Sequence, residues 1–164
     1  MNVKALRITS FDDSFPVRAA ISPFGKWLAV IYSDSRLKLF LVSEKDGQVN
    51  LMADKNWFSG VNDVAFSADP GSGKVTEMAL ATNEGITRVN LISRESLKPV
   101  TSAGARSISY SGAFAILGLE NGSFQIWRLD SEPRLVQETA TGHASAITTS
   151  RANRSGEVYL IDEG

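Results

Sequence analysis

The sequence predicts an all-β chain of repeated four-stranded antiparallel units, and three observations lead to this prediction. Short segments that end in serine recur along the chain, and their serines are 45, 44 and 39 residues apart. Apolar residues alternate with polar ones or form short blocks, which is typical of strands. Turn residues such as Gly, Pro and Asn punctuate each unit at hairpin spacing, which argues against a helical repeat of similar period. The recurring segments are AAIS (19–22), VAFS (64–67), ISYS (108–111) and ITTS (147–150).

Each unit continues in the same order after its serine segment, which is the expected first strand. A loop leads to a short apolar second strand, expected at WLAVIY, VTEMALAT, FAILGL and EVYLI. Tight turns follow at SDS, NEG, ENG and DEG, and such turn residues supply the backbone geometry that hairpins require. Third strands are expected at RLKLFLV, ITRVNLI and SFQIWRL, and fourth strands at VNLMAD, LKPVTS and RLVQETA.

Four strands in a repeat of this length are typical of β-propeller blades. The fold class predicted is therefore all-β, with blades of four antiparallel strands, about three full blades and a partial fourth. The expected division is an N-terminal strand or arm (1–14), blade 1 (15–55), blade 2 (56–103), blade 3 (104–141) and a partial blade 4 (142–164), within a single, incomplete propeller domain.

The units resemble those of the WD-repeat β-propeller family. The resemblance lies in ISPFGKWLAV with SDSRLKLFLV, and in ISYSGAFAILGLENGSFQIWRL. Trp127 stands at the family's tryptophan position, and Gly142-His143 matches its Gly-His pair. No unit has the Trp-Asp dipeptide, so the chain is identified as a divergent member, and a full Asp-His-Ser/Thr-Trp network is not expected in the first three units. The resemblance implies the propeller fold and a binding role, and it names no partner.

Composition narrows the functional classes. The formal net charge is −1 and no basic run appears, so direct binding of nucleic acid or of an anionic membrane is not expected. The absence of cysteine excludes disulfides, thiolate catalysis and cysteine-ligated metals. The first residues lack the apolar core of a signal peptide, and no segment reaches the ~20 apolar residues of a membrane span. We therefore expect an intracellular protein, in the cytoplasm or the nucleus.

The stretch SADPGSGKVT (67–76) contains Gly-Ser-Gly-Lys, which suggests a phosphate-binding loop. That motif requires a glycine five residues before Gly73, where Ala68 stands, and Ser or Thr after Lys74, where Val75 stands. A helix should also follow the loop, whereas a strand is expected here. The stretch is therefore interpreted as an enlarged hairpin loop between the first and second strands of the second unit.

Catalytic chemistry finds little support in the sequence. His143 is the only histidine, and no G-x-S-x-G motif is present. Carboxylates are scattered, and those in turns have a sufficient structural role in accepting hydrogen bonds from turn amides. The sequence therefore predicts a protein that is not an enzyme and has no cofactor. Two alternatives stay open, which are a propeller enzyme with a carboxylate or metal site in its channel and a nucleic-acid-associated subunit of a larger complex.

The function expected is that of a non-catalytic scaffold that mediates protein–protein interactions within a larger assembly. Trp57 and Phe58 lie in a polar connection, and large aromatic residues dominate binding hot spots, although both could instead pack in the core. The loops that join fourth to first strands and second to third strands hold the candidate partner-binding residues. These residues are Asp12, Asp13, Asp34, Arg36, Trp57, Phe58, Glu84 and His143.

The fourth unit contains only two of the expected strands, whereas propellers hide their sheet edges by closing with 4 to 8 blades. A larger propeller of which these residues are one part is the favoured explanation. Copies of the chain could instead associate, or a partner could donate the missing blades.

Overall fold

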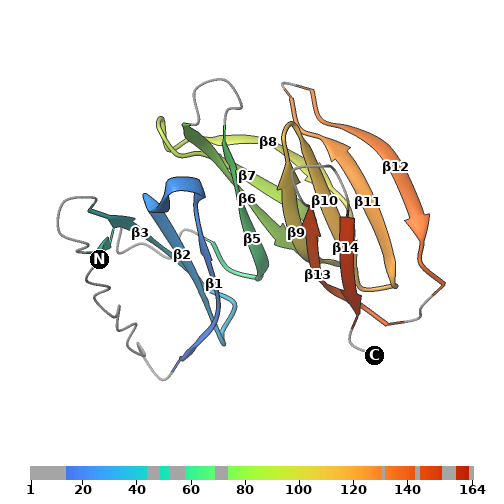
Figure 1. Cartoon of the computed structure of the whole chain (residues 1–164). Coiled ribbons are helices and arrows are strands. Elements are labelled where there is room, and N and C mark those ends of the chain that lie inside the picture. The colour runs from blue at the N-terminus through green and yellow to red at the C-terminus, as the bar shows by residue number, and fades with distance from the viewer. Residues whose placement is uncertain are drawn as a thin grey trace. The chain divides into compact units, whose positions relative to one another are not determined.

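The computed structural model describes residues 14–43, 49–51, 58–68, 74–130, 132–142, 145–152 and 158–162. These residues form fourteen strands and one short 3-10 turn, η1 (Pro23–Gly25), so the fold is all-β as predicted (Figure 1). The strands are β1 (Pro16–Ile21), β2 (Trp27–Tyr32), β3 (Leu37–Val42), β4 (Val49–Leu51), β5 (Val61–Ala68), β6 (Val75–Thr82), β7 (Gly85–Asn90), β8 (Ser96–Thr101), β9 (Ala105–Ser111), β10 (Phe114–Leu119), β11 (Ser123–Arg128), β12 (Arg134–Ala140), β13 (Ile147–Ala152) and β14 (Val158–Asp162).

The strands pair in chain order into blade-like sheets. Three sheets have four strands, in the orders β1-β2-β3-β4, β5-β6-β7-β8 and β12-β11-β10-β9, and a fourth sheet pairs β13 with β14. The registers that the structure defines are antiparallel, as expected for neighbours joined by short turns. The predicted second strands WLAVIY, VTEMALAT and FAILGL coincide residue for residue with β2, β6 and β10.

The turn after the second strand depends on unusual backbone conformations. Gly85 follows the β6–β7 turn with φ of +134°, and Gly122 follows the β10–β11 turn with φ of +75°. A Cβ added to Gly85 would lie 2.0 Å from the carbonyl oxygen of Val100, so a side chain at this position would collide with β8. Ser35 takes the equivalent place before β3 with φ of +59°, a region that few residues other than glycine adopt.

The repeated serine has a clear structural role in the first unit. The hydroxyl of Ser22 accepts a hydrogen bond from the backbone N–H of Trp27 at 2.9 Å, across the loop between β1 and β2. Within that loop Phe24 has φ of +68° and is highly exposed, so the predicted Pro-Phe-Gly turn presents an aromatic ring to solvent.

The chain divides into two compact units, residues 1–61 and residues 62–164, and each is described by itself. The predicted grouping of all blades in a single domain stays a prediction. The core of the first unit contains Leu28, Val30 and Tyr32, with Phe40 and Val42 packed against them. These residues come from β2 and β3, the central strands of the first sheet.

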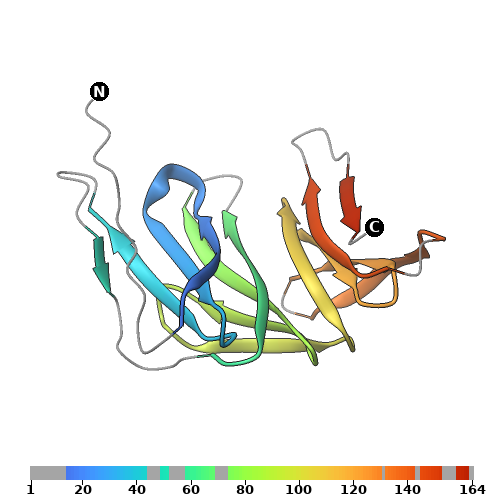
Figure 2. The ribbon, with the colours of Figure 1, turned by 90° about the horizontal axis from the view of Figure 1, so that it is seen from below.

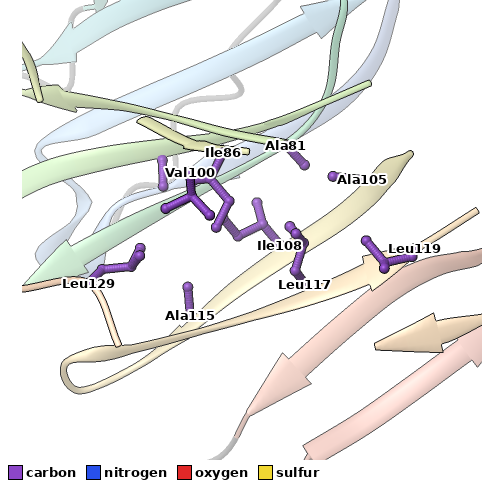
Figure 3. Close-up of a cluster of buried hydrophobic side chains, with 10 residues drawn as sticks. Ala81, Ile86, Val100, Ala105, Ile108, Ala115, Leu117, Leu119 and Leu129 are labelled. Carbon is purple, nitrogen blue, oxygen red and sulfur yellow. The ribbon is translucent and has the colours of Figure 1, made fainter. Parts of the chain in front are cut away.

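In the second unit three sheets pack one after another. Strand β9 lies against β6 of the preceding sheet, and β13 lies against β9 and β10, as both ribbon views show (Figures 1 and 2). Apolar side chains from β6 to β10 fill the space between the first two sheets (Figure 3). The cluster consists of Ala79, Ala81, Ile86, Val100, Ala105, Ile108, Ala115, Leu117, Leu119 and Leu129.

Candidate functional site

Half of the residues predicted to bind partners can be placed in the structure. Asp34, Arg36 and Phe58 belong to the first unit, and Glu84 belongs to the second. The other four, Asp12, Asp13, Trp57 and His143, lie outside the described residues.

The structure brings the three predicted residues of the first unit together around the β2–β3 turn. Arg36 donates its backbone N–H to Asp34 at 3.1 Å, and its Nε pairs with the same carboxylate at 2.5 Å. The carbonyl oxygen of Phe58 accepts the backbone N–H of Leu37 at 3.3 Å, which ties residue 58 to the start of β3. Phe58 itself is half-buried.

The Asp34–Arg36 pair is an ordinary feature of a turn. Desolvation would raise the pKa of Asp34, but the hydrogen bonds and charge of Arg36 outweigh it and hold that pKa below its usual value. The carboxylate is therefore ionised near neutral pH and is already engaged by its neighbour. The lowered pKa of Asp34 is opposite to the shift that would suit a general acid, so the pair gives no sign of acid–base chemistry.

Glu84 lies at the edge of a surface groove of the second unit. The groove has a volume of about 450 Å³ and is formed by the β6–β7 turn, the start of β7 and the end of β8. The hydroxyl of Thr82 accepts the backbone N–H of Glu84 at 3.3 Å and donates to the carbonyl of Gly85 at 3.2 Å. The lining residues are Thr82, Asn83, Glu84, Gly85, Ile86, Thr87, Pro99, Val100, Thr101 and Ala103.

The groove combines one charge with several neutral polar groups. Glu84 supplies the single ionisable side chain among these lining residues, and it is exposed. Thr82, Thr87 and Thr101 supply hydroxyls and Asn83 an amide, while Pro99 adds an exposed apolar surface. The backbone of the turn is fixed from both sides, because Ser102 donates its N–H to the carbonyl of Glu84 at 3.0 Å. The groove is thus a preformed surface with a negative charge on a rigid turn.

A buried ion pair lies between the first two sheets of the second unit. Arg88 on β7 is 4% exposed and forms a two-pronged pair with Glu77 on β6, with Nε and Nη2 at 2.8 and 2.9 Å from the two carboxylate oxygens. Its remaining donors reach the carbonyls of Leu129 at 3.1 Å and Asp130 at 3.3 Å. Tyr110 on β9 donates its hydroxyl to Glu77 at 2.5 Å.

We call Glu77, Arg88 and Tyr110 the inter-sheet triad. Burial raises the pKa of Tyr110 well above its usual value, and the negative charge of Glu77 raises it further. Burial alone would lower the pKa of Arg88, but the hydrogen bonds and charge of Glu77 raise it, so the guanidinium stays charged. Every member is engaged by another, and the triad joins β6 and β7 to β9 and the residues after β11. Its role is structural.

Two further side chains link consecutive sheets at equivalent places. Asp63 lies four residues before Ser67, is 2% exposed, and accepts the backbone N–H of Ile108 at 3.0 Å. Ser107 lies four residues before Ser111 and donates its hydroxyl to the carbonyl of Ile147 at 3.0 Å. Asp63 therefore lies inside β5 and serves the contact with the next sheet.

Trp127, which the sequence analysis matched to the tryptophan of the WD-repeat pattern, does not bond to a Ser or Thr hydroxyl as in the Asp-His-Ser/Thr-Trp network. Its indole N–H donates to Oε1 of Gln125 at 2.8 Å, and the buried hydroxyl of Ser102 donates to the same oxygen at 2.7 Å. The ring packs partly buried against the apolar cluster of the second unit. Gln125 therefore connects the end of β8 with β11.

Sequence reasoning missed the triad and the role of Asp63, although a signal was available. Arg88 interrupts the apolar strand ITRVNLI, and Asp63 interrupts VNDVAFS. A charged residue within a strand whose apolar sequence predicts burial requires a partner, because an unpaired buried charge lowers the stability of the fold. The sequence does not show which partner, since Glu77 and Tyr110 come from other strands.

The described residues contain no group of three or more His, Asp or Glu side chains that could hold a metal ion. Nor do they contain a helix with the length and low polarity that a bilayer requires. Comparison of the sequence with models of known protein families and with curated proteins finds no match.

Proposed function

We propose that this chain is a divergent WD-repeat scaffold that binds other proteins inside the cell, within a larger assembly. The observation that carries the proposal is the groove beside Glu84, a rigid and open surface on the turn where the sequence predicted partner contact. The sequential order of strands within each sheet and the position of Trp127 support the family part of the proposal.

The buried polar side chains form contacts within the protein, which supports a binding function in preference to catalysis. Glu77, Arg88 and Tyr110 are engaged with each other, and Asp63 and Ser107 bond to the backbone of the next sheet. A catalytic acid or base must reach a substrate, whereas these groups face the contacts between sheets. Asp34 and Glu84 in contrast are exposed at turns, where a partner can meet them.

The lining of the groove favours a partner with a basic side chain. Glu84 supplies a negative charge that no cation of the lining balances, and the hydroxyls of Thr87 and Thr101 can accept or donate hydrogen bonds. A lysine or arginine from an exposed loop or tail would pair with the carboxylate. Because the pair lies at the surface, we expect it to set orientation and specificity more than affinity.

The test uses the full chain and an array of short synthetic peptides that vary in their lysine and arginine content. Fluorescence anisotropy with peptides selected from the array would measure the affinity of the wild type, of Glu84→Gln and of Glu95→Gln. Glu95 is the matched control, because it is also an exposed carboxylate near a β-turn of the same sheet but does not line the groove.

We expect the wild type and Glu95→Gln to bind a subset of the basic peptides with equal affinity, and Glu84→Gln to bind them several-fold more weakly. If no peptide binds the wild type, or if Glu84→Gln binds as well as the wild type, the groove is not the binding surface proposed here.

A further inference from the structure

The turn between β10 and β11 contains the pair Asn121-Gly122, and Asn121 is the one asparagine of the sequence that a glycine follows. The side chain of Asn121 is exposed to water. The amide carbon of an asparagine side chain can be attacked by the backbone nitrogen of the next residue, and a glycine there has no Cβ to obstruct the approach. The contacts of this turn therefore decide whether Asn121 is chemically stable.

Two hydrogen bonds hold the side-chain carbonyl of Asn121. The backbone N–H of Ser123 donates to Oδ1 at 3.0 Å, and the hydroxyl of Ser123 donates to the same oxygen at 2.6 Å. When a nucleophile attacks Cγ, negative charge develops on Oδ1. Donors that already point at this oxygen stabilise the charge, as the donors of an oxyanion hole do. The contacts of Ser123 thus favour attack on the amide carbon of Asn121.

The β2–β3 turn of the first unit has the same backbone form. The N–H of Gly122 donates to the carbonyl of Leu119 at 3.2 Å, and the N–H of Ser35 donates to the carbonyl of Tyr32 at 2.9 Å. Gly122 and Ser35 both have a positive φ, of +75° and +59°. Each turn therefore closes three residues after its start and places its last residue in the left-handed region.

The residue before that left-handed position also makes the same bond in both turns. Oδ1 of Asp34 accepts the backbone N–H of Arg36 at 3.1 Å, two residues further on, as Oδ1 of Asn121 accepts the backbone N–H of Ser123. The first unit thus shows that this form of turn accommodates an aspartate in the place where the second unit has Asn121.

We propose that Asn121 is a deamidation site, at which the folded chain gains an aspartate and keeps the turn. The nitrogen of Gly122 bonds to Cγ of Asn121, and the side-chain nitrogen leaves as ammonia with the proton that the Gly122 nitrogen gives up. Water then opens the five-membered imide at one of its two carbonyls, which gives aspartate or isoaspartate. Water is the only co-reactant, nothing is oxidised or reduced, and the chain gains one negative charge.

The other contacts of Gly122 influence the rate and the product. Its N–H must leave the carbonyl of Leu119 before the nitrogen can attack, so we expect the folded chain to react more slowly than a free peptide. Its carbonyl accepts the N–H of Thr141 at 3.3 Å and the hydroxyl of Thr141 at 2.5 Å. Isoaspartate lengthens the backbone by one carbon and would strain these bonds, whereas aspartate leaves the backbone unchanged. We therefore expect a larger share of aspartate from the folded chain than from a peptide.

Peptide mapping by mass spectrometry tests the proposal on the full chain, incubated at mildly alkaline pH. Asn83 is the matched control, because it is an exposed asparagine in the β6–β7 turn and is followed by Glu84. We expect conversion at Asn121 many-fold faster than at Asn83, with a higher ratio of aspartate to isoaspartate than in a synthetic peptide of residues 115–128. Equal rates at the two asparagines, or the product ratio of the peptide in the full chain, would overturn the proposal.

Two variants test the roles of the contacts separately. Ser123→Ala removes one donor to Oδ1 and should slow deamidation several-fold in the full chain, but have little effect in the peptide. Asn121→Asp supplies the product directly and stays informative even if Ser123→Ala does not fold. It should unfold in urea at the wild-type midpoint, whereas Asn121→Leu, which has no acceptor for Ser123, should unfold at a lower one. An unchanged rate in Ser123→Ala would refute the role of its hydroxyl, and a midpoint of Asn121→Asp as low as that of Asn121→Leu would refute the fit of the product.

Discussion

The inter-sheet triad allows a quantitative test of how the sheets of the second unit are held together. The change is Glu77→Gln, which keeps the size of the side chain and an acceptor oxygen for Tyr110 but removes the charge that balances Arg88. The side chains of Arg88 and Glu77 are only 5% and 14% exposed, so water cannot replace the lost partner.

Breaking a buried ion pair by neutralising one partner costs about 3–5 kcal/mol of the free energy of unfolding. Arg88 keeps the carbonyls of Leu129 and Asp130 as acceptors, so the lower end of this range applies. With a urea dependence of about 2 kcal/mol per molar, a loss of about 3 kcal/mol lowers the unfolding midpoint by about 1.5 M. Urea unfolding followed by tryptophan fluorescence measures this shift.

The matched control is Glu132→Gln, which removes the partner of Lys98 at the surface. Those side chains are 78% and 60% exposed, so the expected loss is below about 1 kcal/mol. A triple variant, Glu77→Leu with Arg88→Met and Tyr110→Phe, should lie much closer to the wild type than Glu77→Gln, because an apolar replacement leaves no buried charge unpaired. The reasoning is refuted if Glu77→Gln costs no more than Glu132→Gln.

Three further predictions concern single residues of the second unit. Gly85→Ala should lower the free energy of unfolding by about 3 kcal/mol, because Gly85 has a positive φ and its new Cβ would collide with β8. Gly112→Ala, which has a positive φ but open space around it, should lower the free energy of unfolding by only about 1 kcal/mol. Thermal unfolding compares the two variants. Asp63→Ala leaves the buried N–H of Ile108 without its acceptor and should cost about 1–3 kcal/mol in urea unfolding, while an unchanged midpoint would contradict this. Burial raises the pKa of Tyr110 above that of an unfolded tyrosine, which is about 10, so the folded state favours the protonated hydroxyl. The resulting stability is fully present below pH about 10 and is lost as the pH rises through the folded pKa. Tyr110→Phe should therefore lose less stability at alkaline pH than the wild type, as urea unfolding at increasing pH would measure.

The strands could be predicted from the sequence because their signals are local. The blocks WLAVIY, VTEMALAT and FAILGL are bounded by turn residues, and each became one strand with the predicted ends. Asp34 and Glu84 could be placed at turns for the same reason. Neighbours in the chain became neighbours in the sheet, so no long-range information was required.

The contacts between sheets could not be predicted in this way. Glu77 and Tyr110 are 33 residues apart, and Asp63 and Ile108 are 45 apart, so each pair depends on how whole sheets pack. The groove beside Glu84 likewise requires the end of β8 to lie next to the β6–β7 turn. The sequence shows that Arg88 and Asp63 are charged residues within otherwise apolar strands. It does not show the partners that offset the cost of burying them.

The most direct test of the proposed function is hydrogen–deuterium exchange of the full chain with and without a bound basic peptide. The bound peptide should slow exchange in residues 82–87 and 99–103, which include the lining of the groove, and this protection should disappear in Glu84→Gln. Protection confined to other segments, with residues 82–87 unchanged, would contradict the claim that this surface binds the partner.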